Sequence, residues 1–337
     1  MTDLEQHLLA IIQDAFPLEE RPYQVLADQL GSDEQSAFAA VENLRQSGII
    51  RRIGGVYDSK KLGFISRLCA GKVPTVATGA ADDNALEKFA AAVNEIPAIT
   101  HNYVRSHEYN VWFTVITQSE EEIQKIVDDV CAKTELHDVH ILNATKKFKI
   151  NTVMGGAGAL ANRIGDEKRH CEPKAKQSPA HFLSANDRAR IRIACTDIPH
   201  TLTPFKDWSV SCDELRDDIA QKRMRRFGAI LRHQEAGFAY NAMVCFAKTV
   251  DSRQWSVDRN SVNPAGAILA SKPYISHCYE RPSFEGFPYT LYAMMHAQSA
   301  DELDRNIKEA AKSIGNPDYV VLHSVRELKK TSYRFFA

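Results

Sequence analysis

The chain has 337 residues, of which 44% are apolar and 25% are charged, with 42 basic residues against 43 acidic ones. This composition is typical of globular proteins, and it excludes a disordered chain, a collagen-like chain and a small disulfide scaffold. The formal net charge of −1 counts against a dedicated nucleic-acid binder, because such proteins are usually basic.

The sequence is a doublet. The run RRIGGV at 51–56 is echoed by RRFGAI at 225–230, and ITHNYVR at 99–105 is echoed by ISHCYER at 275–281. Gln118-Ser119 is likewise echoed by Gln298-Ser299, and the order of the echoes is kept. We therefore divide the chain into two halves, 1–152 and 182–337, joined by a connector at 153–181 that is rich in glycine, proline and charge.

Each half is predicted to begin with a helical head. In the first half, apolar residues at helical spacing predict helices over 3–15, 22–30 and 33–47, and 49–57 then reads as a β-wing. Three helices and a wing make a winged helix-turn-helix. We expect one over 1–60 and a degenerate copy over 182–236.

Each half is predicted to end in a tail of the ferredoxin-like type. The order strand, helix, strand, strand, helix, strand is expected over 64–77, 83–94, 97–105, 110–117, 119–133 and 136–148. The matching strands of the second half are expected near 238–248, 273–281, 287–296 and 318–329, with Asn263-Pro264 interrupting the first tail helix. The predicted fold class is α+β, with tail domains over 61–152 and 237–337.

The cysteines do not suggest a metal site or disulfide bonds, and the apolar runs do not suggest a membrane protein. The seven cysteines are odd in number and show no C-x-x-C spacing, so we expect free thiols, no metal site made by the protein and a cytoplasmic location. No stretch reaches the ~20 apolar residues that a membrane helix needs, and the N-terminus shows no secretory pattern.

The presumed recognition helix of the first head is poorly suited to DNA. Residues 33–48 carry Asp33, Glu34 and Glu42 against the single Arg45. Phosphate contacts from lysine and arginine dominate DNA affinity. The helix-turn-helix is therefore interpreted as mainly structural, and DNA is not the expected partner.

The strongest candidate for chemistry is a His-x-Tyr-x-Arg pattern that occurs twice. It comprises His101, Tyr103 and Arg105 in the first half, and His277, Tyr279 and Arg281 in the second. Alternate residues of a strand share a face, so histidine and arginine would lie roughly 13 Å apart, comparable to a large planar ligand. Arginine can hold a carboxylate, and histidine can donate a proton or ligate a metal. The alternative is a polar strand face at a dimer seam.

A second candidate is the cluster of basic residues at the wings. It comprises Arg51, Arg52, Arg225, Arg226, Arg232 and His233. His233 has no counterpart in the first half, where Ser59 takes its place. A contact with DNA phosphates or a solvated edge is the alternative for the arginines, and a surface histidine is the alternative for His233. His296 is a further candidate for contact with a ligand.

Longer runs resemble a specific family. ITHNYVRSHEYNVWFTV at 99–115 is similar to one subunit of siroheme decarboxylase, and MRRFGAILRHQEAGFAYNAMV at 224–244 and ISHCYERPSFEGFPYTLYAMMH at 275–296 are similar to the other. The heads and tails resemble AsnC/Lrp-type regulators, and the longer runs also resemble proteins of heme d1 synthesis. Here the two subunits are fused, which implies a dimer formed within one chain, with higher oligomers open.

The resemblance implies a carboxy-lyase that converts siroheme to 12,18-didecarboxysiroheme in an alternative heme pathway. It implies no cofactor beyond the iron that siroheme carries. The expected proton donors are His233 and His277, with His101 as their counterpart, and His233 or His277 could instead ligate the iron. Tyr103 and Tyr279 would orient or relay the proton. Residues expected to bind the substrate are Arg225, Arg226, Arg232, Arg281, Arg105, Arg51, Arg52 and His296.

Two other functions stay open at this point. A tetrapyrrole-sensing regulator would use the same pocket but bind DNA with an affinity that falls steeply with salt. A storage protein would bind siroheme and return it unchanged. The sequence leaves open which half holds the productive site.

Overall fold

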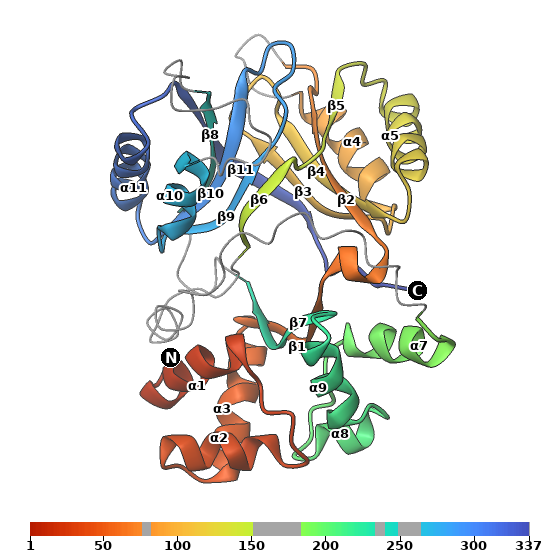
Figure 1. The fold of residues 1–337 in the computed structure, drawn as a ribbon, viewed down its shortest axis with the longest axis vertical. Coiled ribbons are helices and arrows are strands. Elements are labelled where there is room, and N and C mark those ends of the chain that lie inside the picture. The colour runs from red at the N-terminus through yellow and green to blue at the C-terminus, as the bar shows by residue number, and fades with distance from the viewer. Residues whose placement is uncertain (76–81, 151–182, 233–239, 249–263, 337) are drawn as a thin grey trace. The chain divides into compact units, whose positions relative to one another are not determined.

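The computed structural model describes residues 1–75, 82–150, 183–232, 240–248 and 264–336, which fall into two compact units. Unit one contains 1–63, 153–237 and 334–337, and unit two contains 64–152 and 238–333. Unit one thus collects the heads of both halves, and unit two collects both tails (Figure 1). Each unit is described by itself.

The first head in unit one has three helices, α1 (Asp3–Asp14), α2 (Pro22–Leu30) and α3 (Glu34–Gln46). Thr2 and Glu5 form a capping box at the start of α1, and Asp33 caps α3 by accepting from the backbone N–H of Ser36. Helix α2 begins at Pro22 and ends at Leu30, and Gly31 caps it with a φ of 63°, which suits glycine. The three helices lie where the sequence predicts them.

The second head repeats this arrangement with shorter helices, α7 (Ala185–Ala194), α8 (Pro204–Asp207) and α9 (Cys212–Ala220). Capping boxes at Ser184 and Ser211 start α7 and α9. Buried Asp218 of α9 pairs with Arg190 at 3.1 Å and Arg223 at 2.7 Å and accepts from the Tyr57 hydroxyl at 2.8 Å. This buried network ties the second head to the wing strand of the first.

The two wings form one two-stranded sheet instead of separate hairpins. Strand β1 (Ile50–Tyr57) of the first half pairs antiparallel with β7 (Met224–Leu231) of the second, with Gly54 opposite Gly228. A Cβ at Gly54 would lie 2.3 Å from the Thr196 carbonyl oxygen, and one at Gly228 would lie 2.5 Å from that of Ile12. The glycines allow the ends of α7 and α1 to approach the sheet. A short 3-10 helix, η1 (Ser59–Leu62), follows β1.

Unit two contains both tails. The first has β2 (Ile65–Gly71), α4 (Asp83–Asn94), β3 (Ile99–Arg105), β4 (Val111–Thr117), α5 (Glu120–Thr134), β5 (Val139–Leu142) and β6 (Lys146–Ile150). The sequence predicts a single strand over 136–148, but the structure divides it at 143–145. Its two parts pair with different partners, β5 with β2 and β6 with the other half. The strand predicted over 64–77 also ends earlier, at Gly71.

The second tail has β8 (Tyr240–Ala247), α10 (Pro264–Ser271), β9 (Ile275–Glu280), β10 (Tyr289–Ala297), α11 (Ala300–Ser313) and β11 (Tyr319–Lys330). Helix α10 begins at Pro264, at the position that proline favours, and Asn263, the other residue of the predicted interruption, lies outside the described residues. Ser119 and Ser299, the repeated serines of the sequence, cap α5 and α11. The tandem heads and βαββαβ tails confirm the predicted α+β fold class.

The tails exchange strands. The sheet order is β5-β2-β4-β3-β11-β8-β10-β9-β6. Thus β6 of the first half closes the edge of the second, and the end of β11 pairs with β3 of the first. Lysines on the exchanged strands reach helix ends of the opposite half, with Lys329 Nζ 2.8 Å from the Ile96 carbonyl oxygen beyond α4 and Lys149 Nζ 2.7 Å from that of Lys272 beyond α10. The halves therefore form a pseudo-dimer within unit two.

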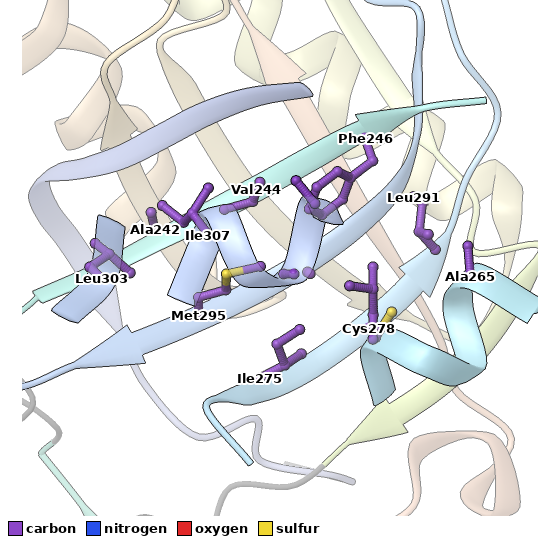
Figure 2. Packing of buried hydrophobic residues seen from close by; sticks show 14 of the residues in the cluster. Ala242, Val244, Phe246, Ala265, Ile275, Cys278, Leu291, Met295, Leu303 and Ile307 are labelled. Atoms are coloured by element: carbon purple, nitrogen blue, oxygen red, sulfur yellow. The ribbon is translucent and has the colours of Figure 1, made fainter. Parts of the chain in front are cut away.

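Among its described residues, unit two has three hydrophobic cores, one in each tail and one between the tails. Helices α10 and α11 cover one flank of the strands and α4 and α5 cover the other (Figure 1). Figure 2 shows the second-tail core, where alternate residues of β8 and β10 such as Val244 and Met295 meet Leu303 and Ile307 of α11. A third core joins the halves, with Ala70, Trp112 and Leu142 from the first and Cys245 and Tyr292 from the second. The strand faces turned away from the helices therefore carry the contact between halves.

Candidate functional site

Each His-Tyr-Arg pattern forms a continuous stack of side chains along one strand. In the first row, which we define as His101, Tyr103 and Arg105 of β3, the His101 and Tyr103 ring centroids are 6.5 Å apart and the Arg105 guanidinium carbon lies 4.9 Å from the Tyr103 centroid. The intervening Val104 points into the core beneath α4 and α5. The row therefore lies on the strand face turned toward the other half, as strand alternation predicts.

The second row repeats this geometry on β9 and the residue that follows it. It comprises His277, Tyr279 and Arg281. The ring centroids of His277 and Tyr279 are 6.3 Å apart, and the Arg281 guanidinium carbon lies 5.1 Å from the Tyr279 centroid and 5.8 Å from that of Tyr292. Cys278 points into the helix-side core. The structure therefore brings the three predicted residues of each half together.

The arginine ends of the rows are buried and hydrogen-bonded to the opposite half. Arg105 is 5% exposed and donates to Ser324 Oγ at 2.6 Å, and Arg281 is 9% exposed and donates to the Leu142 carbonyl oxygen at 2.6 Å. Burial lowers the pKa of both guanidinium groups. In both arginines the Nε atom is buried and finds no hydrogen-bond partner among the described residues. Each arginine thus spans the two halves and retains one donor.

The histidine ends of the rows each contact a hydroxyl group. Thr100 Oγ1 lies 2.8 Å from His101 Nδ1, and Ser276 Oγ lies 2.9 Å from His277 Nδ1. Ser276 Oγ is also 2.9 Å from Nε2 of His296, which is 8% exposed on the neighbouring strand β10. The second half therefore joins two histidines through one serine. We did not predict Ser276, although a hydroxyl residue precedes the histidine in both copies of the repeat.

The predicted wing arginines all lie in unit one, where several have partners within the protein. Arg225 pairs with Asp58 at 3.0 Å, Arg52 donates to the Gly55 carbonyl oxygen at 3.2 Å, and Arg226 donates to the Ala229 carbonyl oxygen at 3.2 Å. Burial lowers the pKa of Arg52 to about 10. Arg51 is half-buried and Arg232 is exposed.

The expected site residues are divided between the units. The two rows and His296 belong to unit two, whereas the five wing arginines belong to unit one. His233 lies outside the described residues. The hypothesis that all of them line one substrate site stays a prediction.

A second polar cluster, which we did not predict, joins the β5 edge of the first tail to the 284–287 turn of the second. The Tyr109 hydroxyl lies 3.3 Å from His140 Nε2 and 3.2 Å from the Glu285 carbonyl oxygen, and His140 Nε2 lies 2.7 Å from Asp138. The rings of His140 and Phe284 stack with centroids 4.0 Å apart. Despite burial of Asp138, which acts the other way, its hydrogen bonds to Lys72 and His140 lower its pKa. The cluster fixes the turn against the opposite half.

Among the described residues, no group of three or more His, Cys, Asp or Glu side chains is arranged to hold a metal ion. Within the same residues, no helix combines the length and apolar character needed to span a membrane.

Family models match most of the chain. Residues 61–149 and 235–329 match the AsnC-like ligand binding domain, and together they make up more than half of the sequence. Residues 5–51 match the siroheme decarboxylase NirDL-like HTH domain.

Several curated proteins are similar to the chain. The siroheme decarboxylase of Hydrogenobacter thermophilus is 29% identical over 98% of this chain and 94% of its own length. The siroheme decarboxylase alpha subunit of Desulfovibrio desulfuricans is 47% identical over 44% of this chain and 82% of the subunit. The beta subunit of Oleidesulfovibrio alaskensis is 37% identical over 47% of this chain and 99% of the subunit.

The fold is also similar to that of a protein whose crystal structure is known. The crystal structure of the siroheme decarboxylase NirDL has a TM-score of 0.67 at 26% identity, with 99% of this chain and 95% of that chain covered. The same protein was solved in co-complex with an iron-uroporphyrin III analogue, with a TM-score of 0.66 at the same identity and coverage.

Proposed function

The chain belongs to the siroheme decarboxylase family and is built on AsnC-like ligand binding domains, and on that premise we propose that it is a carboxy-lyase acting on siroheme. Its reaction removes the carboxyl groups of two acetate side chains and gives 12,18-didecarboxysiroheme. The observation that carries the proposal is the similarity to a siroheme decarboxylase along both halves, each of which also holds one His-Tyr-Arg row. The NirDL co-complex with an iron-uroporphyrin III analogue supports a tetrapyrrole as the ligand.

The residues of the rows suit such a substrate. Siroheme is flat, apolar in its middle and ringed with carboxylates, and aromatic side chains with a few placed cations recognise such molecules. We assign the holding of carboxylates that do not react to Arg281 and Arg105, whose buried Nε atoms find no acceptor among the described residues. The same role is assigned to the wing arginines and His296, namely Arg51, Arg52, Arg225, Arg226, Arg232 and His296.

The reacting acetate needs a different environment. An arginine bound to it would stabilise the carboxylate ground state and slow the reaction, so we expect this group to be desolvated instead. Loss of CO2 leaves the electron pair on the methylene carbon, which must then receive a proton. A histidine is a suitable donor near neutral pH. We assign this step to His277 and His233, with His101 as the counterpart in the first half and Tyr279 and Tyr103 orienting the donors.

The proposal includes no cofactor beyond the iron that siroheme brings, which His233 or His277 could ligate. It also places the reaction in the cytoplasm and makes siroheme the partner, without DNA or membrane. The structure gives one reason to disfavour DNA. Arg45 of α3 has a side chain only 7% exposed and pairs with Asp197 and, at 3.1 Å, with Glu42. The presumed recognition helix therefore holds its arginine against the protein.

The test is anaerobic conversion of siroheme by the purified chain and by the variants His277→Ala and His233→Ala, followed by chromatography of the tetrapyrrole. A general acid contributes about 10²- to 10⁴-fold, so each variant should lose activity within that range. Replacement of the exposed His137 by Ala should leave the rate unchanged. Wild-type rates in both donor variants would refute the assignment of the donors. Siroheme returned unchanged, with DNA affinity that falls steeply with salt, would favour the regulator.

A further inference from the structure

The two rows differ in the number of histidines near the hydroxyl group at their histidine end. Strand register places His296 of β10 where the first half has Ile116 of β4, because His277 lies opposite Met294 just as His101 lies opposite Thr114. The main-chain contacts agree, since the N–H of His296 donates to the Tyr274 carbonyl and that of Ile116 to the Ala98 carbonyl at the corresponding position. The first row therefore has one histidine beside its hydroxyl, and the second has two.

We propose that the second row is the productive one and that Ser276 passes a proton from His296 to His277 during turnover. This inference rests on the proposed function, because it assigns roles within that reaction. His277 is the catalytic residue, whereas Ser276 and His296 are positioning and relay residues behind it, a role that for His296 replaces the carboxylate contact assigned above.

The geometry fits a relay. Both contacts of Ser276 Oγ are 2.9 Å, one to His277 Nδ1 and one to His296 Nε2. A hydroxyl can accept from one nitrogen while donating to the other. Ser276 and His296 are 7% and 8% exposed, so bulk water has little access to this pair. Ser276 therefore couples the protonation of the two rings.

The charges beside the rows favour the same half. Residues directly opposite each other on antiparallel strands share a face. On the second row, the exchanged strand β6 places Lys147 opposite Tyr279. On the first row, β11 places Glu327 opposite Tyr103 and Lys330 opposite His101, and these two residues pair at 3.7 Å, so their charges offset each other. A substrate ringed with carboxylates is therefore attracted by Lys147 beside the second row and meets a neutral ion pair beside the first.

The proposed step balances. The bond between the methylene and carboxyl carbons breaks, CO2 leaves, and its electron pair stays on the methylene carbon. His277 donates the Nε2 proton to that carbon, which becomes a methyl group. Nδ1 of His277 takes the Ser276 hydroxyl proton while Ser276 takes the Nε2 proton of a protonated His296. One proton is consumed for each CO2 released, and solvent later restores it to His296.

The pseudo-symmetry supplies matched variants for the test. Ser276→Ala should slow siroheme decarboxylation by at least about tenfold, since it removes part of a general-acid contribution. Thr100→Ala makes the corresponding change in the first row and should leave the rate within twofold of wild type. Ser276→Thr should restore most of the rate, because Thr100 makes the same contact to His101. Equal losses in Ser276→Ala and Thr100→Ala would overturn the assignment to the second row.

His296→Ile, which copies the first half, tests the relay itself. The rate measured in mixtures of H2O and D2O should depend on more than one proton in wild type and on a single proton in this variant, with circular dichroism confirming that both are folded. A wild-type rate and isotope dependence in His296→Ile would overturn the relay while leaving the proposed function intact. If the wild-type chain itself does not decarboxylate siroheme, the proposed function fails and this inference fails with it.

Discussion

Arg105 and Arg281 each make two contacts at once, one with a tyrosine ring of the same row and one with the opposite half. The guanidinium plane lies over a tyrosine of its own row, and an N–H group reaches the opposite half, where Arg281 binds the Leu142 carbonyl oxygen. A planar fork can make both contacts at once, whereas the ammonium group of a lysine cannot. These arginines therefore serve the seam between the halves as well as the candidate site.

Arg281→Lys should lower the free energy of unfolding by about 1–3 kcal/mol, because it leaves the Leu142 carbonyl without its donor. Urea denaturation measures this, with the exposed Arg305→Lys of α11 as the control. A midpoint unchanged from wild type would show that the contact contributes nothing to the seam.

Burial should make three thiols unreactive. It raises the pKa of Cys69 and Cys278 to about 12 and that of Cys195 to about 11. Because the pKa is higher in the folded state, the thiols stabilise that state fully below the unfolded pKa of ~8.5, and this contribution is lost as the pH rises through about 11–12. In native protein between pH 7 and 10, mass spectrometry should find these three residues unmodified by iodoacetamide, and half-buried Cys131 and Cys212 modified before them. Alkylation of native Cys69 that rises with pH near 8.5 would contradict this.

The two rows could be predicted from the sequence because the His-x-Tyr-x-Arg pattern, which is unspecific by itself, occurs at the matching position of both halves. One His-x-Tyr-x-Arg pattern is compatible with many polar strands, but two at matching positions indicate a shared face. Ser276 and the Tyr109 cluster were missed because their contacts join residues distant in the sequence, such as Ser276 with His296 and Tyr109 with Glu285. Such contacts depend on strand register between elements and on the exchange of the tails.

The wing sheet depends on two glycines that face helix ends. Either Gly54→Ala or Gly228→Ala would place a Cβ within 2.5 Å of a main-chain oxygen, so the helix end would have to move. Overpacking of this kind costs about 1–3 kcal/mol. Thermal unfolding should therefore begin at a lower temperature in both variants, and the exposed Gln35→Ala of α3 should match wild type. Equal melting in all of these proteins would mean that the helix ends move freely.

Helices were predicted more accurately than strand partners. Periodicity and capping residues specify α1, α2 and α3 locally, so their predicted positions agree with the structure. The pairing of β1 with β7, and the division of the predicted strand 136–148 into β5 and β6, are set by contacts with the other half. Alternation within one strand carries no information about such partners.

At the scale of the whole molecule, the halves are joined through their strands. The exchange of β6 and β11 makes each half complete the sheet of the other, and the wings form a shared ladder in unit one. Fusion of the two halves in one chain keeps them at high local concentration. In unit two, residues of both halves also share one buried hydrophobic core.

A cut in the chain tests this organisation. A protease site inserted within 153–181 should, after cleavage, yield two fragments that elute together in size-exclusion chromatography and separate only in denaturant. The reason is that separation would break the ladders between β6 and β9 and between β11 and β3. Fragments that separate in native buffer would contradict the exchange of strands.

The central claim, that this chain decarboxylates siroheme, is tested most directly by the mass of the tetrapyrrole. The purified chain is incubated with siroheme under anaerobic conditions. The tetrapyrrole is then extracted, and its mass is measured by mass spectrometry. We predict the loss of one CO2 and then of a second, with the final product matching 12,18-didecarboxysiroheme. Siroheme recovered with its mass unchanged after binding to the protein would contradict the account.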